Sequence, residues 1–289
     1  LGMSNITSIL RAVSLEKSDL DLGDFEESTI HLALNAGLGA IFYRTLRSPV
    51  YGDAVSSYLG ELHGAELTAR ILTAELLDAT EQILRSSTRL ARTITLLKGI
   101  AICGEYYPQP HLRTMGDIDL LVTRDHQPLL ETVLTSLGYQ QRSENPVEFY
   151  KTHHHSMPFF HPEKRLWVEV HTALFPGSLA VARDRVFSDS HVESKIVPMI
   201  FRGIQTNQLS LELQIPYVCA HMGEHLTFSR ESFAFFDIVY LLNKAGKECN
   251  WDLLLSSLEG TTAAGHVYVI LGYLVSHRII TLPPDILPL

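Results

Sequence analysis

Two aspartates in an apolar segment are the residues of this sequence best suited to metal chemistry. They lie two positions apart in the run Gly116–Val122 (GDIDLLV), which is typical of a β-strand. Because side chains alternate along a strand, Asp117 and Asp119 share a solvent-reachable face about 7 Å apart, while the apolar residues face the core. Two ionised carboxylates this close repel each other, and a divalent cation relieves the repulsion. The alternative is a pair of acids on a solvated strand face.

A third carboxylate follows on a second predicted strand, Leu166–His171. Its valines face one side, and Glu169 and His171 face the other. If the two strands are neighbours, Asp117, Asp119 and Glu169 form an oxygen-rich cluster that suits Mg²⁺ or Mn²⁺. His171 then serves either the substrate side of this cluster or a structural hydrogen bond.

Positive charge for a phosphate group lies upstream of the aspartates. A short buried strand is predicted at Thr93–Leu97, and it runs into Lys98, Gly99 and a segment of small residues that opens a helix. Backbone N–H groups at such a position form an anion pocket, to which Lys98 and Arg113 add charge. We therefore predict that Lys98, Gly99 and Arg113 bind a nucleotide.

These motifs together resemble the DNA polymerase β nucleotidyltransferase superfamily, and more narrowly the bacterial "uncharacterised nucleotidyltransferase" family. The similarity rests on Leu97-Lys98-Gly99, Tyr106-Tyr107-Pro108, Leu112-Arg113, Asp117–Val122 and Val168–His171, and it continues through His221, His225 and Asp237. One departure stands out. Typical superfamily members carry Gly-Ser shortly before the first aspartate, whereas here Gly99 is followed by Ile100 and lies further from Asp117.

The resemblance implies an α+β fold, with a small mixed β-sheet nucleotidyltransferase core flanked by N-terminal and C-terminal helical regions. It also implies metal-dependent transfer of a nucleoside monophosphate from a nucleoside triphosphate such as ATP to an acceptor hydroxyl, with release of pyrophosphate. Asp117, Asp119 and Glu169 would be both the catalytic residues and the ligands of Mg²⁺ or Mn²⁺. The acceptor is left open between a small molecule, a protein and an RNA end.

Two other functions fit the same residues. A nucleotide-binding or partner-binding module of the same fold would have lost the transfer chemistry, and the missing Gly-Ser favours this alternative. A metal-dependent phosphohydrolase would share the carboxylates without needing a phosphate pocket that opens from a glycine.

Three polar residues in the C-terminal part form a further group of interest. His221 and His225 lie four residues apart on a predicted helix and so face one side, while Asp237 lies in an otherwise apolar helix. A buried carboxylate needs a partner. With His171, these three are the predicted substrate-binding residues, and the alternative is a His–Asp hydrogen bond that ties two helices together.

The tract His153-His154-His155 has the residue type of a metal site. A strand is predicted at Phe149–His154, and alternation along it allows at most His153 and His155 to share an ion. The alternative is a polar hairpin strand beside the active site.

Composition restricts the class of protein and its partners. The 289 residues are 46% hydrophobic, enough for one large or two modest globular domains. A formal net charge of −9 argues against duplex DNA as a partner. The three cysteines are widely spaced, which favours reduced thiols in the cytoplasm. No signal peptide is expected, because the N-terminus lacks a basic region followed by an apolar run and a cleavage site. No membrane span is expected, because the most apolar late stretch contains histidines, an arginine and glycines.

We expect three regions along the chain. They are an N-terminal helical region at residues 1–90, the nucleotidyltransferase core at 91–200 and a C-terminal helical region at 201–289. Within the core, a helix is predicted at Gln127–Leu137, with Gly138 ending it. Beyond about residue 207 the chain reads as helical, including a helix at Trp251–Leu258.

Overall fold

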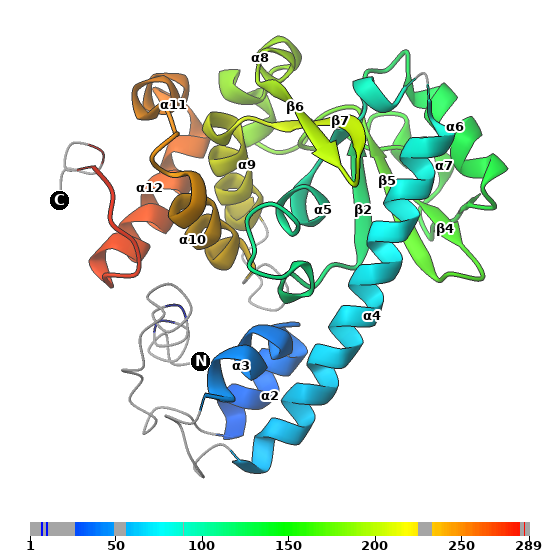
Figure 1. The fold of residues 1–289 in the computed structure, drawn as a ribbon. Coiled ribbons are helices and arrows are strands. Elements are labelled where there is room, and N and C mark those ends of the chain that lie inside the picture. Colours follow the sequence, from blue (N-terminus) through cyan, green and yellow to red (C-terminus); the bar gives the residue numbers. More distant parts are fainter. Residues whose placement is uncertain are drawn as a thin grey trace.

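The structure is a computed structural model, and it describes residues 7, 10, 27–48, 56–88, 90–224, 233–283 and 286. In this part of the chain, one mixed sheet of seven strands is flanked by helices that precede and follow it in sequence (Figure 1). The expected α+β class, with a mixed sheet between two helical regions, is confirmed.

The sheet has the strand order β3-β4-β5-β2-β1-β7-β6, which places β2 at its centre. Strand β2 pairs with β5 in parallel and with β1 in antiparallel orientation. Ile118 and Leu120 of β2 and Val168 and Val170 of β5 are fully buried, as expected for strands covered on their apolar face. The strands are β1 Thr95–Leu96, β2 Asp117–Leu121, β3 Gln140–Gln141, β4 Phe159–His161, β5 Leu166–His171, β6 Ile196–Phe201 and β7 Ile204–Leu209.

A long helix connects the N-terminal helices to the sheet. Helix α4, Ser56–Ser86, begins beside α2 (Glu27–Asn35) and α3 (Gly39–Leu46) and ends against β2, β7 and α6 (Figure 1). Its first half contributes Leu62 to the core shared with α3, and its second half contributes Ile83 to the core under the sheet. One element therefore fixes the N-terminal helices relative to the strands that carry the acids.

The C-terminal helices pack around α9, which contacts α10, α11 and α12. None of the helices in the described ranges combines the length and the apolar character needed to cross a membrane. The remaining α-helices are α5 Lys98–Ile102, α6 Gln127–Ser136, α7 Val147–Tyr150, α8 Asp189–Ser194, α9 Leu211–Glu224, α10 Phe233–Ala245, α11 Trp251–Leu258 and α12 Thr262–Ser276, and the 3₁₀ turns are η3 Ala91–Thr93, η4 Pro110–Leu112, η5 Val181–Arg183 and η6 Arg185–Phe187.

Several predicted elements are confirmed. The strand at Leu166–His171 and the helix at Trp251–Leu258 have the predicted bounds, and Gly138 ends α6 with a φ of +91°. All three cysteines are free and buried.

The predicted strand at Phe149–His154 is wrong. Pro146 precedes a short helix there, α7, and accepts the Phe149 N–H at 3.0 Å, and bends carry the chain through His154. Pro146 is the N-cap of this helix, and its backbone is extended rather than helical, so the apolar-polar alternation after it belongs to a helical turn and not to a strand. The actual strand is β4, further along the chain.

The sequence analysis also missed the β6–β7 hairpin. Pro198 in β6 reads as a strand breaker, but β6 is the edge strand of the sheet, where proline is tolerated. Arg202 and Gly203 make the turn with φ values of +47° and +80°. The sheet thus continues to Leu209, and the division of the chain at residues 90 and 200 stays a prediction.

Candidate active site

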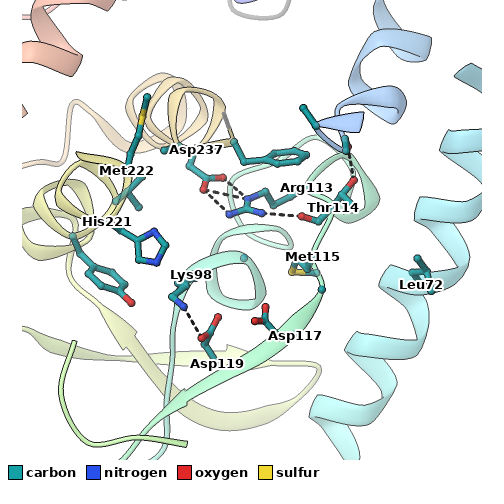
Figure 2. A pocket seen from close by; sticks show the side chains of 18 of the residues that line it. Leu72, Lys98, Arg113, Thr114, Met115, Asp117, Asp119, His221, Met222 and Asp237 are labelled. Carbon is teal, nitrogen blue, oxygen red and sulfur yellow. Dashed lines mark hydrogen bonds and ion pairs between the residues drawn. The ribbon is translucent and has the colours of Figure 1, made fainter. Parts of the chain in front are cut away.

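The three predicted acids come together at the centre of the sheet. In the parallel pair β2 and β5, Asp119 is aligned with Glu169 and Asp117 with Trp167. Figure 2 shows Asp117 and Asp119 projecting from the same strand into one space. Asp119 is 3% exposed, whereas Asp117 and Glu169 are partly buried. Asp119 therefore does not lie on a solvated strand face. The expectation that the two strands are neighbours is confirmed.

Two side chains donate hydrogen bonds to Asp119. The Lys98 ammonium donates to its Oδ1 at 2.8 Å, and His171 Nε2 donates to the same oxygen at 2.8 Å. Burial disfavours the charged carboxylate, but Lys98 and His171 outweigh burial and hold the pKa of Asp119 well below its usual range. Burial likewise disfavours a charged His171, yet hydrogen bonds to Asp119 and Glu169 raise its pKa. Asp119 is thus ionised at neutral pH.

Asp117 has the opposite electrostatic environment. Repulsion from Asp119 and then burial raise the pKa of Asp117 to about 7. The two carboxylates repel each other when both are ionised, and a divalent cation bound beside them would relieve this repulsion.

The donor atoms around Asp119 fit a metal ion. One atom each of Asp119, Glu169 and His171 lie within 4.8 Å of one another. The two carboxylate oxygens are the candidate ligands, because His171 Nε2 donates its hydrogen to Asp119. His171 Nε2 is 3.4 Å from Glu169 Oε2 as well as 2.8 Å from Asp119. Two carboxylate oxygens with a third acid, Asp117, on the same face match the preference of Mg²⁺ and Mn²⁺ for oxygen ligands. His171 joins the two ligating carboxylates and so orients them.

The predicted phosphate side lies at α5. Lys98 opens this helix with a φ of +47°, an unusual conformation for a side chain other than glycine. Gly99 follows, and a Cβ at this position would lie 2.6 Å from Met115 Cγ. The close approach of Met115 explains why glycine is needed here.

Arg113 is buried in an ion pair with Asp237 rather than left open toward solvent. Its Nε and Nη2 donate to Asp237 at 2.8 and 3.0 Å, and its Nη1 donates to the Thr114 carbonyl at 2.8 Å. Tyr107 donates to the same carboxylate at 2.6 Å, and the guanidinium lies over the Phe233 ring. Burial opposes the charge on Arg113, but Asp237 outweighs it and raises the pKa of Arg113. The loop before β2 is thereby tied to α10.

A pocket of about 530 Å³ joins these groups. Figure 2 shows His221 in it between Arg113 and Lys98, while Leu72 contributes from α4 on the other side. The lining comes from the α2–α3 loop, α4, α5, the loop before β2, β2 itself, α9 and α10. Among the predicted site residues, Lys98, Gly99, Arg113, Asp117, Asp119, His221 and Asp237 line it.

The remaining predicted residues take other places. Glu169 and His171 do not line the pocket, and His171 contacts Asp119, which does. His225 lies outside the described residues. His153, His154 and His155 gather in a bend beside β5, with the bridge between His155 and His171 joining the two.

Sequence reasoning missed two tyrosines of the site. Tyr107 was quoted only as part of a motif, yet it is fully engaged with Asp237, and burial raises its pKa well above the usual value. Tyr217 lines the pocket, and its buried hydroxyl has no hydrogen-bond partner within the described part of the chain. A tyrosine in an apolar helix was the available signal, because its hydroxyl requires a partner or a ligand when buried.

Comparison with known proteins identifies a family. A family model described as "Uncharacterised nucleotidyltransferase" matches residues 26–277. The structure is similar to the solution structure of the antibiotic-resistance factor ANT(2'')-Ia, with 14% sequence identity and a TM-score of 0.39 over 71% of this chain and 94% of that chain. No curated protein matches the chain in sequence.

Proposed function

The chain belongs to the uncharacterised nucleotidyltransferase family, and we propose that it transfers a nucleoside monophosphate from a triphosphate such as ATP to an acceptor hydroxyl with the help of Mg²⁺ or Mn²⁺. One observation supports this most strongly. The β2–β5 register sets Asp119 beside Glu169, with Asp117 on the same face and a pocket of about 530 Å³ adjoining them.

In the proposed reaction, the acceptor oxygen bonds to the α-phosphorus while the bond from that phosphorus to the bridging oxygen breaks, and pyrophosphate leaves. Divalent ions held by Asp117, Asp119 and Glu169 would lower the pKa of the acceptor hydroxyl and neutralise the charge of the leaving group. His171 keeps Asp119 and Glu169 oriented for this task through its Nε2 contacts.

Lys98 and Gly99 are the proposed triphosphate-binding residues. The Lys98 ammonium lies in the pocket wall and pairs with Asp119, the carboxylate that a metal ion would use. Lys98 and a metal ion therefore compete for Asp119. An ammonium released from Asp119 stays in the pocket, where the triphosphate is the natural counter-charge.

The sequence predicts that Arg113 binds the nucleotide, but most of its N–H groups already have partners. Each of its three nitrogens already donates one hydrogen bond to Asp237 or Thr114, which leaves two N–H groups for a phosphate. We propose that Arg113 mainly positions the loop before β2 against α10, and that any phosphate contact uses the remaining N–H groups. Asp237, its partner, acts through Arg113 in the same way.

The C-terminal helices are proposed to present the acceptor. His221 and Tyr217 from α9 line the pocket. Figure 2 shows His221 on the side of the pocket away from Leu72 of α4. Polar groups in a partly apolar wall are suited to orient a hydroxyl. The acceptor class stays open between a small molecule, a protein and an RNA end, while the net charge of −9 disfavours duplex DNA.

Labelled products test the proposal directly. The protein is incubated with triphosphates labelled at the α-phosphate, with Mg²⁺ or Mn²⁺ and a cell extract, and the labelled acceptor and pyrophosphate are identified. Asp117→Asn should abolish labelling. Asp125→Asn, an exposed acid just past the end of β2, is the matched control and should label normally. Binding without turnover would support a binding module instead, and release of free phosphate a phosphohydrolase.

A further inference from the structure

We propose that His153, His154 and His155 form a second metal site, which binds a transition-metal ion of the Zn²⁺ class and is separate from the acidic site. Each histidine offers one nitrogen, and the three nitrogens lie within 4.8 Å of one another. The ring centroids of the three pairs are 4.3, 4.3 and 4.7 Å apart. Imidazole nitrogen is a preferred ligand of Zn²⁺, Ni²⁺ and Cu²⁺, and a poor one for Mg²⁺.

The backbone makes this convergence feasible. In a strand, the middle histidine would point away from its neighbours, but here bends replace the strand from Thr152 to His154. The strand alternation that would allow at most His153 and His155 to share an ion is therefore absent here. Two hydrogen bonds fix the segment to β5 and its extension, since Ser156 N–H donates to Val170 at 2.9 Å and Thr172 N–H donates to His154 at 2.8 Å.

The hydrogen-bonding state of the rings also points to a ligand. The Nδ1 atoms of His153 and His154 are buried and have no hydrogen-bond partner among the described residues. His155 Nδ1–H donates to the Ser156 carbonyl at 2.7 Å, which leaves its Nε2 as an acceptor. A backbone carbonyl on one ring nitrogen is the usual support for a metal on the other. Unpaired buried nitrogens otherwise cost free energy.

The histidine cluster is accessible from solvent. All three histidines are partly exposed, so an ion can reach them from solvent. Three protein ligands with one position left to water or another group are a common arrangement for zinc. The nearest acid, Glu169, has its Oε2 3.9 Å from His155 Nε2, so the histidine cluster borders the acidic site while using different donor atoms.

Zinc titration of the full chain tests the proposal. Zn²⁺ binding is followed by competition with a chromophoric chelator in excess Mg²⁺, and Co²⁺ absorption in the visible range reports the ligand geometry. The wild type should bind one equivalent. His153→Ala and His154→Ala should each weaken this binding about tenfold or more, because each removes a ligand. His191→Ala, a partly buried histidine on α8, and Asp117→Asn should both retain wild-type zinc affinity.

Folding of each variant is checked by circular dichroism, and His153→Asn provides a second, smaller change at the same position. Unchanged zinc affinity in the folded His153 and His154 variants would overturn the proposal. A loss of zinc binding in Asp117→Asn equal to that in the histidine variants would also overturn it, because the ion would then sit on the acidic cluster.

Discussion

The buried ion pair between Arg113 and Asp237 allows a quantitative prediction of stability. Asp237 is 2% exposed and accepts hydrogen bonds from Arg113 at 2.8 and 3.0 Å. Arg113→Met removes the cation and leaves the carboxylate buried. Breaking such a pair from one side costs about 3 to 5 kcal/mol of unfolding free energy. We expect the lower end, about 3 kcal/mol, because Asp237 keeps its 2.6 Å hydrogen bond from Tyr107.

The companion variant separates charge burial from lost packing. Arg113→Met combined with Asp237→Leu removes both charges, and the unfolding free energy should recover by about 1 kcal/mol or more relative to Arg113→Met alone. Arg85→Met is the matched control, because Arg85 pairs with Glu81 on the surface of α4. This variant should leave the unfolding free energy almost unchanged.

Urea denaturation followed by circular dichroism measures these differences, with the slope of free energy against urea serving as a check on two-state unfolding. The reasoning would be refuted if Arg113→Met cost no more than Arg85→Met. It would also be refuted if Arg113→Met combined with Asp237→Leu were no more stable than Arg113→Met alone, since removing the second charge would then bring no recovery.

Lys98→Met should raise Mn²⁺ affinity in the absence of nucleotide, because a competitor for Asp119 is gone, and should lower triphosphate affinity about tenfold or more. Calorimetric titration with each ligand checks both signs, and a change in the same direction for both would contradict the assignment. Glu169→Gln should slow nucleotidyl transfer more than it weakens nucleotide binding, because Glu169 does not line the pocket but is a proposed ligand of the catalytic ions. Equal losses in the labelling and binding assays would count against this role. Gly99→Ala should weaken nucleotide binding because its Cβ meets Met115, and Met115→Ala in the same chain should restore the affinity measured by titration. A failure of that rescue would locate the defect elsewhere.

The acidic cluster could be predicted from the sequence because short-range rules determine it. Strand alternation fixes which face Asp117 and Asp119 share, and the buried apolar pattern of Leu166–His171 makes that segment a central strand. Two such central strands in one sheet are expected to be neighbours. The register that aligns Asp119 with Glu169 comes from the structure, because a slip of two residues would keep the same side chains on the same faces.

The partners of the basic residues could not be predicted in this way. Arg113 and Asp237 are 124 positions apart, and only the packing of α10 against the loop before β2 brings them together. The same holds for Tyr107, whose partner is 130 positions away. The histidine tract shows a different limit, because the apolar-polar alternation of Phe149–His154 predicted a strand where the chain forms the end of α7 and a bend.

Metal-dependent nucleotide binding tests the central claim most directly, since it requires no knowledge of the acceptor. ATP binding is measured by calorimetry with and without Mn²⁺ for the wild type, Asp117→Asn, Asp119→Asn and the exposed control Asp125→Asn. The account predicts Mn²⁺-dependent ATP binding in the wild type and in Asp125→Asn, and its loss in folded Asp117→Asn and Asp119→Asn. Wild-type Mn²⁺-dependent affinity in both of those variants would contradict the metal site and the proposed transfer chemistry with it.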